Sequence, residues 1–291
     1  MLNFLVPDVQ DLGLNLDLFG PALLTGLGFA LYLPVLGCYL RLRDEILASL
    51  AYAQVGAAGA LGAMALGASL NTGGLLAALG VASAKHRLVD VADARPSVRS
   101  SARSSTLYAV ILVIAWGIGI LLTSNFPLAE RLGHALFDGQ LLLSGGEQPL
   151  LTLLGSLVGL IVLSRLSKRL LLAQLFPDIW RLRSPRWQWL HLGFDLLAAI
   201  SIAIATMCLG VMATFSLLLV LPWMAFVHRS NWRHACRWAM TTSVLGYLLA
   251  FGLSLAWDQP FGPVLALCLV SLAAVTAQLK PATVSLPPRC G

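Results

Sequence analysis

Charged residues are scarce in this chain of 291 residues, because Asp, Glu, Lys and Arg together make up only 11% of it. A soluble globular domain is about one-quarter charged and less than half apolar. Here 58% of the residues are hydrophobic and the mean hydropathy is +0.83. This balance excludes an intrinsically disordered chain, and it also excludes a soluble protein of one or two domains.

Cysteine is sparse too, with five residues and no C-x-x-C pair or Cys/His ligand spacing. This pattern argues against a disulfide scaffold and against a structural zinc site. The sequence also lacks a G-x-x-x-x-G-K-[ST] phosphate loop, an H-E-x-x-H pair and a Ser/His/Asp set. An intramembrane enzyme therefore has no candidate catalytic group, and any ATP-driven activity requires an ATPase on another chain.

Apolar runs long enough to span a bilayer recur along the whole chain and predict an all-α, polytopic transmembrane helix bundle. The third run is short for a hydrocarbon core about 30 Å thick, so eight spans would remain if this run were re-entrant. The nine predicted spans are 18–40, 46–68, 71–84, 105–124, 149–164, 190–208, 211–227, 238–256 and 262–279.

The basic residues predict the orientation of these spans. With the N-terminus outside, 18 of the 19 Lys and Arg residues fall in inside segments and only Arg131 lies outside. The positive-inside rule therefore places the N-terminus outside and the C-terminus inside. Residues 1–17 are then an extracytoplasmic tail, residues 18–280 the transmembrane domain and residues 281–291 a cytoplasmic tail. The net charge of +6 is a topology signal, and no nucleic-acid partner is expected.

One inside segment, at about 165–189, is neither a clean span nor a clean loop. It alternates basic, aromatic and Leu residues, and Pro177 followed by Asp178 has the form of a helix start. It is either an amphipathic helix on the membrane surface or a docking element for a cytoplasmic protein, and composition alone favours the surface helix.

Ionisable residues within the predicted spans are rare, which makes each of them a candidate for function. Asp195 lies only about one turn inside the sixth span, close to a basic inside segment. We expect it to snorkel toward the inside surface or to pair with an inside Arg, rather than to relay protons.

Four segments of the chain resemble the membrane permeases of ABC importers for zinc, manganese and iron. Residues 210–225 resemble the family signature VGxLLxxxLLxxPAA, and residues 258–263 resemble D-x-P-x-G-P. Residues 136–142 resemble L-L-F-G-x-L-L with one residue inserted, and residues 37–43 resemble the end of the first family helix. The order and spacing of these segments match over roughly residues 18–280.

The resemblance implies a permease in the bacterial plasma (inner) membrane, where it works as a homodimer. Its implied partners are two cytoplasmic ATPase subunits, which hold ATP and Mg, and an extracytoplasmic metal-binding protein. No cofactor is implied on this chain itself. In that family an inside segment couples to the ATPase, and Pro177, Asp178, Ile179 and Trp180 match its start. The resemblance thus favours docking over membrane-surface anchoring, although Ser184 and Pro185 stand where the family usually has a glycine.

The second span departs from the family pattern G-D-x-L-x-H-A, whose Asp and His lie on one helix face and can share a divalent cation. In a gapless alignment Leu50 takes the Asp position and Gln54 the His position. Gln54, Ser49 and Leu50 are therefore the candidates for the translocation path, and the metal ligands are unknown. Either the metal passes with fewer ligands, or it binds elsewhere, or the cargo is a metal chelate (metallophore complex).

Two other classes of protein stay open as alternatives. An ion-coupled secondary transporter would need midplane carboxylates or interrupted helices with repeat symmetry, and the scarcity of central ionisable residues argues against it. A non-transporting paralogue is consistent with the missing Asp/His pair.

Overall fold

The computed structural model describes residues 16–85, 98–138, 148–175, 187–228 and 231–278, and within these ranges it contains helices and no strand. The helices are α2 (Leu16–Leu42), α3 (Ile46–Ala65), α4 (Leu70–Lys85), α5 (Val98–Asn125), α6 (Pro127–Asp138), α7 (Gln148–Leu175), α9 (Trp187–Leu209), α10 (Val211–Phe215), the π-helix η3 (Ser216–Val220), α11 (Leu221–His228), α12 (Trp232–Trp257) and α13 (Phe261–Gln278).

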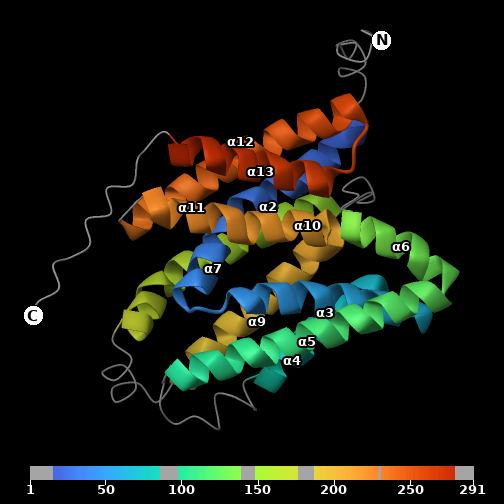
Figure 1. The fold of residues 1–291 in the computed structure, drawn as a ribbon, viewed down its shortest axis with the longest axis horizontal. Coiled ribbons are helices and arrows are strands. Elements are labelled where there is room, and N and C mark those ends of the chain that lie inside the picture. Colours follow the sequence, from blue (N-terminus) through green and yellow to red (C-terminus); the bar gives the residue numbers. More distant parts are fainter. Residues whose placement is uncertain (1–15, 86–97, 139–147, 176–186, 229–230, 279–291) are drawn as a thin grey trace, which may run out of the picture.

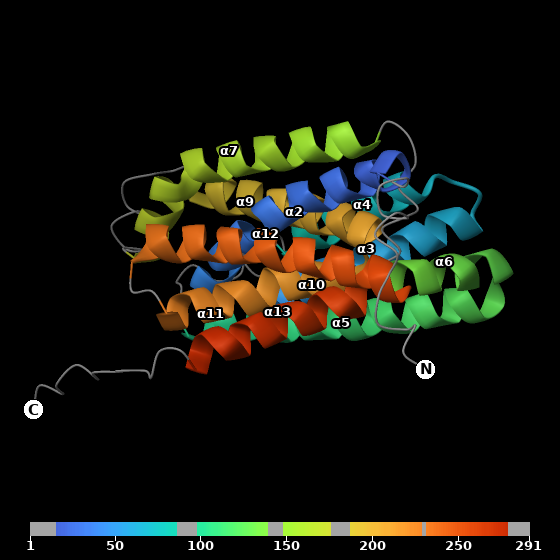
Figure 2. The same ribbon diagram turned by 90° about the horizontal axis from the view of Figure 1, so that it is seen from above.

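The long helices run along a common direction and alternate in sense (Figures 1 and 2). α2, α4, α7, α11 and α13 end at the left of Figure 1, where α3, α5, α9 and α12 begin. With α10, η3 and α11 taken as one pass and the short α6 not counted, the described helices make nine passes, as the apolar runs predict. The polytopic helical bundle is therefore confirmed, and the first and last passes start and finish at opposite ends.

Helix length and composition fit a bilayer. Five described helices are long and apolar enough to cross a membrane: Gly20–Leu42, Ile46–Ala65, Ser105–Asn125, Trp189–Leu209 and Trp232–Trp257. The short third pass, α4, is one continuous helix of 16 residues, about 24 Å long at 1.5 Å per residue. It returns to the end of the bundle where α3 begins, so within the described residues it crosses the bundle and does not turn back.

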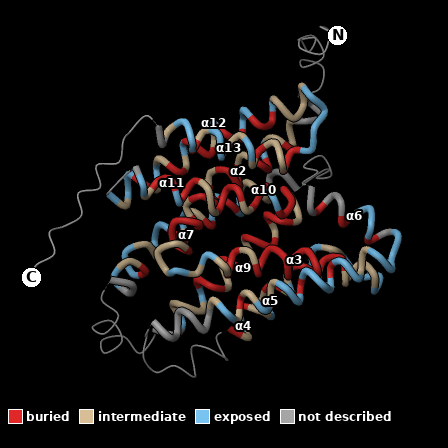
Figure 3. Tube along the Cα trace, viewed as in Figure 1, coloured by how far each residue is buried: buried red, intermediate tan, exposed pale blue. Residues whose placement is uncertain are grey.

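The burial pattern separates central from peripheral helices. Most residues of α3 are buried, whereas α5 exposes large apolar side chains such as Val113 (68% exposed) and Leu121 (64%) (Figure 3). α7 and α12 expose Leu157 and Leu249 in the same way. Apolar surface of this extent is destabilising in water and is typical of helices that face lipid.

Small residues allow α3 and α4 to cross closely. A Cβ added to Gly59 would lie 2.8 Å from the Gly73 carbonyl oxygen, and one added to Gly74 would lie 2.9 Å from the Gly56 carbonyl oxygen. Contacts this short are not tolerated by real side chains, so glycine is required at the crossing. This is the small-residue packing that helices use where lipid removes the hydrophobic driving force.

The seventh pass, predicted as 211–227, is one continuous helical segment that contains a π-helical stretch. Gly210, at φ +88°, separates α9 from α10, and residues 216–220 form the π-helix. Pro222 has no N–H to donate to the Leu218 carbonyl, so the regular α-helical hydrogen bond cannot form there and a wider turn results. That carbonyl packs directly against Gly37 of α2, where a Cβ would overlap it.

The segment between α5 and α7 contains a helix, α6, that apolar runs do not reveal. Its Ala129 and Leu136 are buried against Leu61 of α3, beside Leu122 and Met207. α6 begins at Pro127, in the first-turn position where a missing N–H costs nothing. It lies at the right end of the bundle in Figure 1, opposite the end where α3 begins.

Candidate functional site

The predicted coupling segment falls largely outside the described residues. Residues 165–175 continue α7 and residues 187–189 begin α9. Pro177, Asp178, Ile179 and Trp180 lie in the range 176–186, which the structure does not describe, so their docking role stays a prediction.

The predicted path residues lie near the start of α3. Leu50 and Gln54 are four positions apart and therefore share one helix face. Leu50 is half-buried and Gln54 is 8% exposed. Ser49 is fully buried, and its hydroxyl donates to the Ile46 carbonyl at 2.7 Å.

An apolar groove of about 530 Å³ opens beside Ser49, between α2, α3, the η3–α11 segment and α13. It adjoins the close Gly37–Leu218 contact and reaches Trp223 and Val270, while Leu50 and Gln54 are not among its lining residues. Arg41 is its one charged lining residue, and the guanidinium stands 5.7 Å from the Phe226 ring centre. An apolar site with a single positive charge does not attract a bare divalent cation.

No group of three His, Cys, Asp or Glu side chains that could hold a metal ion occurs among the described residues. A neutral amide and a hydroxyl are weak ligands for zinc without an anionic partner. The predicted path residues Ser49, Leu50 and Gln54 therefore include no anionic ligand.

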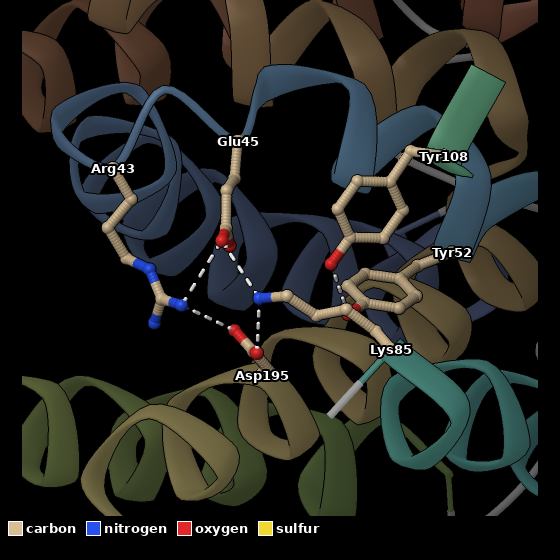
Figure 4. Close-up of polar contacts among 6 residues, drawn as sticks. All are labelled: Arg43, Glu45, Tyr52, Lys85, Tyr108 and Asp195. Atoms are coloured by element: carbon tan, nitrogen blue, oxygen red, sulfur yellow. Dashed lines mark hydrogen bonds and ion pairs between the residues drawn. The ribbon is translucent and has the colours of Figure 1, made fainter. Parts of the chain in front are cut away.

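A buried cluster of four charged side chains lies at the end of the bundle where α3 begins (Figure 4). The Lys85 ammonium stands 2.6 Å from Asp195 Oδ2 and 2.8 Å from Glu45 Oε1. Arg43 Nη2 stands 3.0 Å from Asp195 Oδ1 and 3.3 Å from Glu45 Oε1. Each cation thus bridges both carboxylates, and two positive charges balance two negative ones. We call these four residues the charge cluster.

The turn between α2 and α3 presents two members of the charge cluster. Asp44 is left-handed at φ +55°, its N–H bonds to the Arg41 carbonyl, and the Glu45 N–H bonds to the Leu40 carbonyl at 3.0 Å. These two bonds define a Schellman motif, which ends α2 and turns the chain sharply into α3. Arg43 and Glu45 are thereby held on either side of one tight turn.

Aromatic rings enclose the charge cluster. The Arg43 guanidinium lies over the Phe194 ring at 4.7 Å, and the Lys85 ammonium lies 6.0 Å from the Tyr108 ring centre. The Tyr52 and Tyr108 hydroxyls are 3.0 Å apart, which joins α3 to α5 (Figure 4). The Tyr52 hydroxyl is therefore directed toward α5. The rings exclude water and strengthen the ion pairs they surround.

The electrostatics of the α2–α3 turn follow from this enclosure. Burial by itself raises the pKa of Glu45, but the Arg43 guanidinium and the Lys85 ammonium outweigh it, and the pKa falls from 4.5 to about 2. Burial alone lowers the pKa of Arg43, and the Asp195 and Glu45 carboxylates raise it above its usual value. Both groups are therefore charged at neutral pH.

The charge cluster confirms one sequence expectation and extends it. Asp195 does pair with an inside Arg, namely Arg43. Sequence reasoning missed Glu45 and counted Lys85 only as a topology signal. Lys85 is the last residue of α4, and the sequence predicts it as the first cation of an inside loop. Only its 2% exposure in the fold identifies it as a buried residue.

Comparisons with known proteins agree on one family and one fold. The family model described as "ABC 3 transport family" matches residues 15–280. PsaBC from Streptococcus pneumoniae in complex with Fab has a similar fold, with a TM-score of 0.75, 16% identity, and coverage of 96% of this chain and 99% of that one. An inward-facing structure described as a metal-chelate type ABC transporter has a TM-score of 0.68, 18% identity, and coverage of 95% and 91%. No curated protein matches the chain significantly.

Proposed function

The chain belongs to the ABC 3 transport family, and we propose that it is the permease subunit of an ATP-driven importer for a divalent metal ion: zinc, manganese or iron. It would work as a homodimer in the bacterial plasma membrane, with two cytoplasmic ATPase subunits and an extracytoplasmic metal-binding protein. ATP binding would close the ATPase subunits against the segment that holds Pro177 to Trp180 and switch the paired permeases between outward-open and inward-open states. The permease itself would break no covalent bond.

The observation that carries this proposal is the match of the family model over nearly the whole chain, together with a nine-pass bundle of the same fold as an ABC transporter. Gln54 and Leu50 then stand on α3 where the family pattern has a His and an Asp. With a neutral amide at this position the ion would be passed on by weak and transient coordination rather than held.

A second candidate cargo is a metal chelate. The groove beside Ser49 favours it, because about 530 Å³ lies in the size range of small-molecule sites. Its apolar walls and the positive charge of Arg41 suit an anionic organic ligand wrapped around a metal. One of the similar structures is described as a metal-chelate type transporter.

Elemental analysis of cells tests the proposal. Cells that lack this chain should contain less of one transition metal than wild-type cells when that metal is limiting, and the wild-type chain should restore the content. A chain with Asp178→Arg should not restore it, because the added positive charge opposes ATPase docking. Metal contents that are equal with and without the chain, for all three metals, would contradict the proposal.

A further inference from the structure

The charge cluster joins three parts of the chain that each adjoin a different inside connection. Arg43 and Glu45 flank the α2–α3 turn, and Lys85 is the last residue of α4. Asp195 lies in the third turn of α9, the first described helix after the segment that holds Pro177 to Trp180. All four side chains lie within 3.3 Å of a partner of opposite charge (Figure 4).

Stability alone does not account for the charge cluster. Taking four charges out of water is costly, and well-packed apolar side chains of similar volume are often as stable or more so. What ion pairs add is direction, because each pair fixes the relative position of two helices more strictly than apolar contacts that can slide. What the cluster has to explain is therefore the fixed relative position of the helices that it joins, rather than their stability.

A polar connection between α9 and the start of α3 runs through this cluster. Asp195 is linked to Glu45 by two parallel bridges, one through Lys85 and one through Arg43. Glu45 immediately precedes the first residue of α3, and Leu50 follows five residues later. The connection thus ends at the base of the helix that bears Leu50 and Gln54.

Two atoms of the charge cluster are free for a second arrangement. Arg43 Nη1 and Glu45 Oε2 are buried and make no hydrogen bond within the described part of the chain. A spare donor and a spare acceptor allow Arg43 and Glu45 to exchange partners without leaving a charge bare. Coupling between distant sites requires an element with two discrete arrangements of this kind.

We propose that the charge cluster is the joint that makes α9 and the start of α3 move together, so that an ATP-driven displacement reaching α9 repositions the face of Leu50 and Gln54. Its members are positioning residues and do not contact the cargo. The inference rests on the proposed function, since it requires an ATPase partner that acts on the segment before α9.

The test uses the double variant Lys85→Met/Asp195→Leu. It removes one positive and one negative charge together, so no net charge is left buried and the remaining Arg43–Glu45 pair stays matched. The control is Glu130→Leu/Arg131→Met, which removes the charges of two adjacent exposed residues on α6. Both variants and the wild type are assembled with the ATPase subunits in lipid nanodiscs. Amide hydrogen exchange of residues 46–50 is then measured without nucleotide and with ATP trapped.

In the wild type and in the control, trapped ATP should change the exchange of residues 46–50. In the double variant the ATPase subunits should still co-purify, and this nucleotide-dependent change should be lost. A merely structural role would alter exchange equally in both nucleotide states and leave the change intact, which would overturn the proposal, as would a wild type without any ATP-dependent change. This readout needs no cargo, so failure of metal uptake would refute the proposed function separately.

Discussion

The Lys85 ammonium lies 2.6 Å from the Asp195 carboxylate although the two residues are 110 positions apart and end up on different helices. Both side chains are only 2% exposed. This contact joins the C-terminal end of α4 to α9, and with Glu45 and Arg43 it links both to the turn that starts α3.

Removing one partner of that contact should be strongly destabilising. Lys85→Met leaves two buried carboxylates facing one cation, and breaking a buried pair in this way costs about 3–5 kcal/mol. Thermal unfolding in detergent should show a clear loss for Lys85→Met and a recovery in Lys85→Met/Asp195→Leu. The exposed Lys168→Met is the control and should change stability by about 0.5 kcal/mol or less. Equal losses in the single and double variants would contradict the pairing.

The stabilisation by Glu45 should depend on pH only in acid. Its folded-state pKa is lowered from 4.5 to about 2, so its contribution is fully present above the unfolded-state value and is lost as the pH falls through the folded-state value. The stability difference between wild type and Glu45→Gln, followed by thermal unfolding, should be constant from pH 6 to 8 and shrink between about 4.5 and 2. A difference that shrinks already at neutral pH would refute the enclosed ion pairs.

The close α3–α4 crossing predicts different effects on stability for alanine substitutions at two glycines. Gly59→Ala forces a Cβ against the Gly73 carbonyl and should destabilise the protein by about 1–3 kcal/mol. Gly80→Ala, on the same pair of helices but with open space around it, should be neutral or stabilise by about 0.5–1 kcal/mol. Thermal unfolding of both variants compares them directly, and a neutral Gly59→Ala would mean that α3 and α4 do not cross this closely.

Restoring the family's Asp and His at positions 50 and 54 should make the predicted path bind a free metal ion more tightly. Leu50→Asp with Gln54→His places a carboxylate and an imidazole on one helix face, where they can share a divalent cation. The KM for a free ion should fall in this double variant, and Gln54→Ala alone should alter uptake of the natural cargo. Kinetics that stay unchanged in both variants would place the path elsewhere.

ATPase docking should depend on the residues around Asp178. Asp178→Arg reverses a charge in the segment predicted to couple and should reduce co-purification of the ATPase while the chain still inserts in the membrane. The exposed Arg131→Glu, on α6 at the opposite end of the bundle, serves as the control. If Asp178→Arg retains the ATPase fully, the coupling segment has been assigned to the wrong residues.

Much of the fold follows from the sequence because lipid imposes a simple rule: apolar runs of about 20 residues become helices, and cations mark the inside ends. That rule predicted nine passes, and pairing with an inside Arg was one of the two outcomes expected for Asp195. It missed α6, because this helix has only 12 residues and is amphipathic, with Ala129 and Leu136 buried, so it contains no long apolar run. It also missed the π-helical stretch before Pro222, which depends on one absent N–H inside an otherwise apolar stretch.

The charge cluster could be predicted only in part, for a physical reason. Three members of the cluster, Arg43, Glu45 and Lys85, lie in predicted inside segments, where a charged residue is normally solvated and needs no partner. Their burial arises from tertiary contacts between α2, α4 and α9, which local sequence patterns do not encode. Asp195 was recognisable because it alone lay within an apolar run, where a carboxylate must find a cation.

The most direct measurement of the central claim is ATP-dependent uptake of labelled zinc, manganese and iron, each free and chelated, into vesicles that contain this chain, its ATPase subunits and its binding protein. The account predicts saturable uptake of one metal that requires ATP and is abolished by Asp178→Arg. Uptake of the free ion would support the divalent-ion proposal, and uptake of the complex alone would favour the chelate. No ATP-dependent uptake of any metal in either form would contradict the account.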